Sequence, residues 1–515
     1  MQDGYLAVSQ STNLFSPERV AMIDLGTPES VLGTRRGKAV LALLLAIGFL
    51  DFVDASIVNV ALPSIRRELG FSVQSLQWVL SAYLVTYGGF MLLGGRLADL
   101  VGRRRLVVAG TLVFFASSIS GGSAQNPGTL VGSRLAQGVG AAMMLPAALS
   151  ILTTTFSNPL DRAKALGAWG ALGGLASAFG VLLGGVLSDL LNWRWVFFVN
   201  PPVCLVVLFA VFRLLPADEP RRRGRVDVIG AVLLTAAMLL LVYTIVEAPD
   251  KGWGSGRTVG GLIVAGALLL VFAVFEARQA DPLFPFSIFR IKGLGEADLT
   301  MVVAMAGFYS MFFFLTLYLQ NVLGFSPLKA GLVYIPATFG VALTAGIGSK
   351  LVLKTGTRPL IVLGAFLGAG GILWLSFIPA DGTWLGNVLA PLQVMSFGLG
   401  FVFFGVTTAA QAGVPEHQAG LAAAMINTSM WLGGALGIAI FSAIASSRTN
   451  HRLGAGVSQA SALTSGFQAA LLAAAIFLAA AGLIAFRSRN ATATDMMGTQ
   501  TEPEADGVLA QTVEV

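Results

Sequence analysis

Long apolar runs separated by short polar segments fill the chain between residues 39 and 486. Each run is close to the length of roughly 20 residues that an α-helix needs to cross the hydrocarbon core of a bilayer. Glycine and proline inside these runs do not argue against helices, because membrane helices tolerate both. The pattern predicts an all-α membrane protein with fourteen transmembrane helices. The predicted helices are residues 39–61, 76–97, 105–124, 130–154, 165–190, 195–215, 227–247, 258–277, 297–319, 331–352, 359–378, 385–408, 418–444 and 463–486.

The composition agrees with this pattern and excludes a large soluble domain. Of the 515 residues, 55% are hydrophobic and only 11% are charged, whereas soluble domains carry about 25% charged residues. A soluble fold of this length could not bury so much apolar surface. The net charge of +6 lies in short segments between the apolar runs, so it does not indicate a nucleic-acid partner. The single cysteine, Cys204, cannot form an intrachain disulfide.

The lysines and arginines predict how the chain is oriented in the membrane. An even number of helices places both termini on one side. On that side lie 23 of the 32 basic residues, eight lie on the other side, and Arg134 lies within a span. Because basic residues concentrate in cytoplasmic loops, we expect a multi-pass protein of the cytoplasmic membrane with both termini in the cytoplasm. The first 38 residues are polar and lack the apolar core of a signal peptide.

Two stretches of the chain resemble later stretches. The sequence GGRLADLVGRRR at 94–105 is echoed by GSKLVLKTGTR at 348–358, at an offset of 254 residues. A second echo, at an offset of 253, relates Gly180 and Gly184 to Gly433 and Gly437. Duplicated halves are typical of transporters. The alternative is that glycine and basic residues recur by chance in membrane loops.

The repeat predicts how the chain is divided. We expect two six-helix halves, with an additional pair of helices inserted between them. The predicted regions are a cytoplasmic N-terminal tail at 1–38, the N-terminal half at 39–215, the inserted pair with its flanking loops at 216–296, the C-terminal half at 297–486 and a cytoplasmic C-terminal tail at 487–515.

The loop sequence at 94–105 resembles the signature of the major facilitator superfamily. The match is carried by Gly95, Asp99, Gly102, Arg103 and Arg104, whereas Leu100 replaces a usual basic residue. Glycine permits a tight turn, and an aspartate here can accept hydrogen bonds from helix N-terminal amides or from a nearby arginine. The resemblance implies a gating loop that stabilises one conformation and then releases it. The alternative is a basic anchor that only sets the topology.

Five further motifs resemble the fourteen-span drug:proton antiporters of this superfamily. They are LDFVDASIVNVALP at 50–63, RLAQGVGAA at 134–142, GVLLGG at 180–185, WRWVFFVNPPV at 193–203 and LYLQNVLGFSPLKAGL at 317–332. The resemblance implies the major facilitator fold and proton-driven export of drugs by alternating access. Val181 stands where the antiporter motif usually has proline, and this weakens the inference of antiport.

Three charged residues lie inside predicted helices: Asp51, Asp54 and Arg134. Buried charge in a membrane is costly and marks functional sites. Asp51 and Asp54 are three residues apart and share a helix face, so both cannot ionise easily and they should titrate as a coupled pair. If Arg134 faces this helix, it can hold one aspartate ionised and leave the other to exchange protons. We expect Asp54 to carry the proton, because it occupies the family position. An alternative is a structural ion pair between Asp51 and Arg134.

Other polar and aromatic residues are candidates for substrate binding. Aromatic walls with few polar groups suit bulky cationic compounds, although single aromatic residues in membrane helices often serve packing instead. The glycines at 180, 184, 433 and 437 are expected to allow close helix packing. Asp298 and Glu276 lie near helix ends and are expected at the membrane interface. The candidate substrate residues are Gln77, Trp78, Tyr83, Tyr309, Phe312, Gln320, Asn427 and Trp431.

The sequence favours a monomeric exporter of hydrophobic, cationic drugs or antibiotics, with protons and the lipid bilayer as its other partners. The alternative is a facilitator or symporter of a small metabolite. A phosphate-binding loop for ATP is absent from the sequence. Its two histidines, His417 and His451, lie in predicted loops. We therefore expect neither an enzyme nor a bound cofactor or metal.

Overall fold

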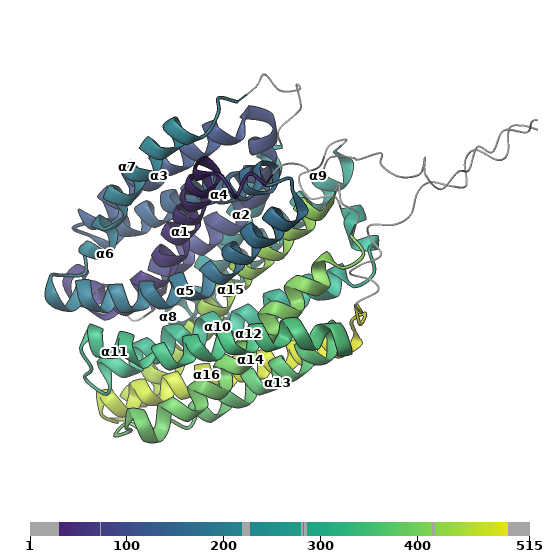
Figure 1. The fold of residues 1–515 in the computed structure, drawn as a ribbon. Coiled ribbons are helices and arrows are strands. Elements are labelled where there is room, and N and C mark those ends of the chain that lie inside the picture. The colour runs from purple at the N-terminus through teal and green to yellow at the C-terminus, as the bar shows by residue number, and fades with distance from the viewer. Residues whose placement is uncertain are drawn as a thin grey trace, which may run out of the picture.

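The computed structural model describes residues 30–72, 74–218, 227–279, 282, 286–414 and 418–492. Within these ranges all regular secondary structure is helical, and the helices form two layers (Figure 1). Most of the predicted tails at 1–38 and 487–515 lies outside the described residues.

All fourteen predicted runs coincide with helices. Thirteen helical stretches in the described part of the chain are long and apolar enough to cross a membrane, and the remaining run, 165–190, lies in the 32-residue helix α5. The prediction of an all-α membrane protein is therefore confirmed. The helices are α1 (Arg35–Leu69), η1 (Ser75–Gln77), α2 (Trp78–Val101), α3 (Arg103–Gly122), α4 (Pro127–Thr155), α5 (Pro159–Leu190), α6 (Trp195–Phe198), α7 (Asn200–Leu214), α8 (Val228–Lys251), α9 (Gly256–Arg278), η2 (Phe286–Arg290), α10 (Leu294–Asn321), α11 (Pro327–Val333), α12 (Ile335–Thr355), α13 (Thr357–Leu375), η3 (Trp384–Val388), α14 (Leu389–Gln411), α15 (Ala419–Gly454) and α16 (Gln459–Arg487).

Prolines and polar caps mark several helix starts. Two predicted runs are each divided into a short and a long helix, α6 with α7 and α11 with α12, and each long helix begins with proline in its first turn. Proline suits this position because the first-turn amide has no partner within the helix. At the start of α4, the side chain of Asn126 accepts a hydrogen bond from the amide of Thr129 at 2.9 Å. Such caps satisfy amides that would otherwise be unpaired.

Glycines allow two equivalent helix pairs to pack closely. A Cβ atom at Gly184 of α5 would lie 2.4 Å from the carbonyl oxygen of Ile57 in α1. A Cβ atom at Gly437 of α15 would lie 2.3 Å from the carbonyl oxygen of Ala306 in α10. One helical turn earlier, Gly180 faces Val53 and Gly433 faces Val302 in the same way. The pair α10–α15 therefore repeats the geometry of the pair α1–α5.

A second equivalence between the first and last groups of helices lies at the face of the molecule where α1 begins and α16 ends. We call this face the terminal face. Gly102 and Gly356 join α2 to α3 and α12 to α13, with φ angles of 116° and 79° that favour glycine. Asp218, which follows α7, accepts from two first-turn amides of α3 at 3.1 and 2.9 Å. Asn490, which follows α16, accepts from a first-turn amide of α13 at 2.9 Å. The segment after α7 thus returns a side chain to cap α3, and the segment after α16 returns one to cap α13.

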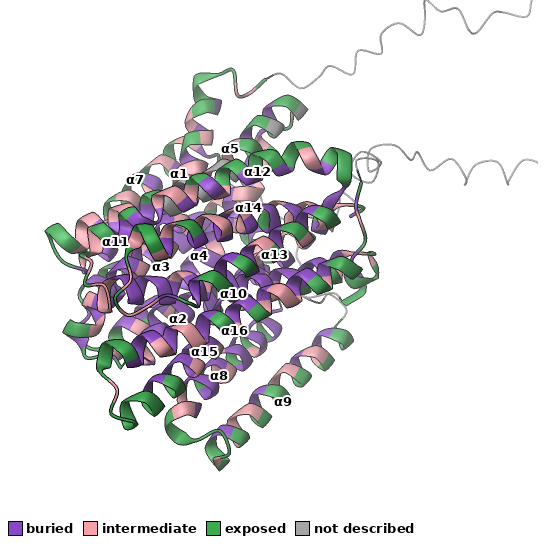
Figure 2. Cartoon of the chain, turned by 90° about the horizontal axis from the view of Figure 1, so that it is seen from below, coloured by how far each residue is buried: buried purple, intermediate pink, exposed green. Residues whose placement is uncertain are grey.

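The two helix sets, α1–α7 and α10–α16, meet along α2 and α15 and at the face opposite the terminal face. There, Gln320 of α10 donates to the carbonyl oxygen of Val60 in α1 at 2.7 Å. A Cβ atom at Gly185 of α5 would lie 2.9 Å from the Cα atom of Leu328 in α11. The inserted helix α8 packs on both α2 and α15, and α9 lies at the periphery beyond it (Figure 2).

Candidate functional site

Asp54 lies at the centre of a buried polar network. It is fully buried within α1. Arg134 Nη1 of α4 donates to its Oδ2 at 2.6 Å, and Gln137 Nε2 of α4 donates to its Oδ1 at 2.7 Å. Asn200 Nδ2, from the first turn of α7, also donates to Oδ1 at 2.7 Å. A cation and two amide donors therefore surround this carboxylate.

Arg134 is fully buried as well; its Nε and Nη1 donate hydrogen bonds, whereas its Nη2 has no partner among the described residues. Its Nε donates to the carbonyl oxygen of Val79 at 3.0 Å, and its Nη1 also donates to Gln137 Oε1 at 2.6 Å. The guanidinium carbon lies 4.2 Å from the centre of the Tyr83 ring. The arginine does face α1, as the sequence analysis considered, but it pairs with Asp54. The alternative of an ion pair with Asp51 was therefore wrong.

Asp51 has a different environment one helical turn away. It is fully buried, and its carboxylate accepts from Tyr83 Oη at 2.8 Å and from Tyr87 Oη at 2.9 Å. Both donors are neutral phenols on α2, placed on one face by their spacing of four residues. The two aspartates are thus held by contrasting partners, an arginine with two amides for Asp54 and two phenols for Asp51.

An aromatic cluster next to Asp51 contains residues of both helix sets. We define it as Tyr83 and Tyr87 of α2, Tyr309 of α10 and Trp431 of α15. The Trp431 ring stacks on Tyr87 with centres 4.6 Å apart, and it lies 6.0 Å from Tyr309 and 6.4 Å from Tyr83. Trp431 Nε1 is buried without a hydrogen-bond partner among the residues that the structure describes. The cluster therefore belongs to both helix sets.

The gating loop forms a weaker set of contacts at the terminal face. Arg103 Nη2 lies 3.6 Å from Asp99 Oδ1, and the Asp99 side chain is 61% exposed. Arg103 Nη1 also donates to Thr154 Oγ1 at the end of α4 at 2.7 Å. The first-turn amides of α3, including that of Arg104, are capped by Asp218. Of the two partners considered for Asp99, only the arginine is in contact with it.

Comparisons with known proteins place the chain in a family. A model of the Major Facilitator Superfamily matches residues 44–438. The chain belongs to this superfamily. It is 38% identical over 413 residues to the puromycin resistance protein pur8 of Streptomyces alboniger, covering 79% of this chain and 82% of that protein. It is 39% identical over 424 residues to the cephamycin export protein CmcT of Amycolatopsis lactamdurans, covering 81% of this chain and 87% of that protein.

A solved structure shows the same fold. The crystal structure of a bacterial homologue of the human lysosomal transporter Spinster, inward-facing and unoccupied, has a TM-score of 0.63. It is 17% identical in sequence, and the match covers 92% of this chain and all of that chain. Together with the family model, this confirms the resemblance noted in the motifs. The chain is therefore a major facilitator transporter.

The candidate substrate residues of this transporter fall into two groups. Tyr83, Tyr309 and Trp431 meet in the aromatic cluster, whereas Phe312 is on α10 one turn beyond Tyr309 and packs on Tyr334, with ring centres 5.5 Å apart. The other candidates lie outside the cluster. Gln77 accepts from Ser81, Trp78 begins α2, Gln320 joins α10 to α1, and Asn427 donates to the carbonyl oxygen of Ala423 in its own helix.

Several residues of this site were missed by the sequence analysis. Tyr87 is four residues after Tyr83 and could have been found from that spacing. Asn200 is a polar residue inside an apolar run, which is a signal for function in a membrane. Asp218 gave no signal, because its role depends on the chain returning to α3. Groups of three or more histidine, cysteine, aspartate or glutamate side chains placed to hold a metal ion are absent from the described ranges.

Proposed function

We propose that this transporter exports hydrophobic, cationic drugs or antibiotics across the cytoplasmic membrane in exchange for protons. The observation that carries the proposal is the pair of fully buried aspartates on α1, one held by Arg134 and the other by tyrosines of the aromatic cluster. The names of the relatives, which describe antibiotic resistance and export, support the choice of substrate.

The two aspartates would share the work of proton exchange. In the described conformation Asp54 is paired with a cation, so the proton is expected on Asp51, whose donors are neutral. Asp54 can accept a proton only after Arg134 moves away from it. Asp54 therefore keeps its proposed role in proton coupling, with the Asp54–Arg134 contact as the switch and Asp51 as the other member of a coupled pair.

The aromatic cluster gives a physical basis for exchange. A cation with an apolar body can place its charge against aromatic faces and against the Asp51 carboxylate. A proton on Asp51 removes that negative charge, so proton and substrate compete for one site. Because the cluster is shared by α2, α10 and α15, relative movement of the helix sets would expose it to one side at a time.

The proposed division of the chain into halves uses the boundaries predicted from the sequence. We assign the two halves to residues 39–215 and 297–486, with the inserted pair at 216–296, and propose a monomer with both termini in the cytoplasm. The loop containing Asp99 would then lie on the cytoplasmic side. Its exposed contact with Arg103 suits a latch that must break in each cycle, since exposed ion pairs contribute only about 0–1 kcal/mol.

Everted membrane vesicles test the proposal. Addition of a cationic antibiotic should discharge a pre-formed pH gradient in vesicles with the intact transporter, and Asp54→Asn should abolish this discharge. The matched control is Glu296→Gln, an exposed carboxylate on α10. A gradient that persists while the antibiotic still crosses the membrane would instead favour a facilitator, which Val181 in place of the usual proline leaves open.

A further inference from the structure

A third buried carboxylate lies in the second helix set. Asp298 is in the second turn of α10 and is only 6% exposed. Ser429 Oγ of α15 donates to its Oδ1 at 2.9 Å. Its Oδ2 is buried and has no hydrogen-bond partner in the described part of the chain. Asp298 thus lies near a helix end, as the sequence indicated, and its carboxylate is buried against α15.

The surroundings of Asp298 provide little stabilisation for a negative charge. Helix α14 has no charged residue, and α15 has none before Arg448, near its opposite end. The helix α1, which also touches α10, brings Asp51 and Asp54, both held by the partners described above. The remaining charged residues on or beside the packed elements lie toward helix ends: Glu296, Arg290, Lys292, Lys329, Arg487 and Arg489, together with Arg35, Arg36, Lys38, Arg66, Arg67 and Glu68 of α1.

The comparison with Asp54 shows what this means for its charge. Asp54 accepts hydrogen bonds from a guanidinium and two amide donors. Asp298 has a single hydroxyl donor, and one of its oxygens is buried without any. An ionised carboxylate that is buried and so poorly paired is costly, and such a group takes up a proton instead.

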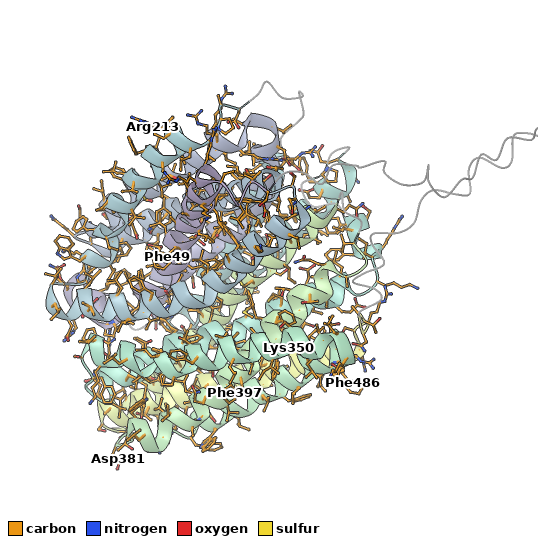
Figure 3. The ribbon with its side chains drawn as sticks, viewed as in Figure 1. Phe49, Arg213, Lys350, Asp381, Phe397 and Phe486 are labelled. Atoms are coloured by element: carbon orange, nitrogen blue, oxygen red, sulfur yellow. The ribbon has the colours of Figure 1, made fainter. Side chains whose placement is uncertain are left out.

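The internal repeat gives a second, independent argument. Because Val302 faces Gly433 as Val53 faces Gly180, Asp298 corresponds in position to Phe49 of α1. Asp298 is therefore two residues, or about 3 Å along the helix axis, from the depth of Asp51. Phe49 (Figure 3) packs on Phe179 of α5 with ring centres 5.3 Å apart. An apolar residue occupies the equivalent position in the first helix set, so helix packing does not require a carboxylate at the position of Asp298.

We propose that Asp298 is a second proton-binding site of the transporter, located in the C-terminal half and bound through Oδ2. The role deepens the proposed function, on which it rests for its part in transport. The step is a simple proton transfer: hydronium protonates the carboxylate while the site is hydrated and leaves as water, and the described conformation holds the protonated carboxyl group away from water. The proton returns to water when relative movement of α10 and α15 hydrates the site.

Infrared spectroscopy of the full-length transporter in lipid tests the site without any substrate. The carbonyl stretch of a protonated carboxyl group absorbs at a different infrared frequency from the stretches of a carboxylate. At neutral pH, Asp298→Asn should lose one protonated-carboxyl band that Glu296→Gln retains. Asp298→Glu should keep a protonated-carboxyl band at a shifted frequency. This variant distinguishes loss of the carboxyl group from loss of the band through misfolding. Identical carboxyl bands in the wild type and in folded Asp298→Asn would overturn the proposal.

Transport in proteoliposomes separates this proposal from the proposed function. If both are correct, Asp298→Asn should still bind the antibiotic, but should exchange one proton fewer per molecule exported than Glu296→Gln does. An unchanged proton count in Asp298→Asn would overturn its role in coupling. Wild-type export without any proton movement would refute the antiport function, while the infrared band would still decide whether Asp298 holds a proton.

Discussion

Replacement of one side chain of the Asp54–Arg134 pair should lower the free energy of unfolding by more than the intact pair adds to it. The tested variants are Asp54→Asn, Arg134→Met and the double variant. In Asp54→Asn the guanidinium stays buried next to a neutral amide. In Arg134→Met the carboxylate keeps only Gln137 and Asn200 as donors. The double variant leaves no uncompensated charge in the network.

The geometry sets the magnitude of these effects. Both side chains are fully buried, and Arg134 Nη1 lies 2.6 Å from Asp54 Oδ2. Loss of one partner from such a pair costs about 3–5 kcal/mol in the free energy of unfolding. The double variant should cost less than the two single variants together, by a coupling free energy of about 2–3 kcal/mol. This corresponds to roughly a 30- to 150-fold change in the ratio of folded to unfolded protein.

Denaturant titration of the purified protein in mixed micelles measures these free energies. The control cycle uses Glu68 and Arg194, a surface pair 2.7 Å apart in which Glu68 is exposed and Arg194 is partly buried, with Glu68→Gln and Arg194→Gln. Its coupling free energy should stay below about 1 kcal/mol. All variants are expected to insert into the membrane. If the effects of Asp54→Asn and Arg134→Met simply add within about 0.5 kcal/mol, the two side chains do not interact in the folded protein and the reasoning fails.

Three further predictions concern packing, gating and coupling. Gly184→Ala should lower the free energy of unfolding by about 1–3 kcal/mol, because the added Cβ atom would lie 2.4 Å from the Ile57 carbonyl oxygen. The control is Gly132→Ala, which should be tolerated because no atom lies within 4 Å of the added Cβ atom. Equal stabilities of the two variants in denaturant titration would contradict the close packing at Gly184. Asp99→Asn should retain stability and substrate binding but slow turnover in a transport assay, and unchanged turnover would leave the loop as a topology anchor only. Export of a monovalent cation should respond to a potassium–valinomycin potential, since each exchanged proton beyond the first adds about 2.3 kcal/mol per 100 mV. Asp51→Asn should weaken this response and keep part of the pH-driven transport, whereas a wild type that ignores the potential argues against more than one proton.

The sequence alone determined the helices and the family of this protein. A bilayer requires each spanning segment to satisfy its own backbone hydrogen bonds and to be apolar over a fixed length. Both requirements are local, so all fourteen runs could be predicted, although α1 and α15 extend eight and ten residues beyond the predicted ends. The motifs at 94–105 and 50–63 are also contiguous in sequence, and they were sufficient to predict the superfamily. The repeat of Gly180 and Gly184 by Gly433 and Gly437 pointed to equivalent helix pairs for the same reason.

Only the tertiary structure decided which buried polar groups meet. The sequence showed that Arg134 and an aspartate were candidates to pair, but the choice of Asp54 depends on how α1 and α4 are rotated. A helix that is apolar on nearly all sides carries no strong pattern that fixes this rotation. The burial of Asp298 likewise depends on α15, which begins more than 100 residues later in the chain. Contacts between distant helices are set by packing in three dimensions, and hydrophobic pattern along the chain does not determine them.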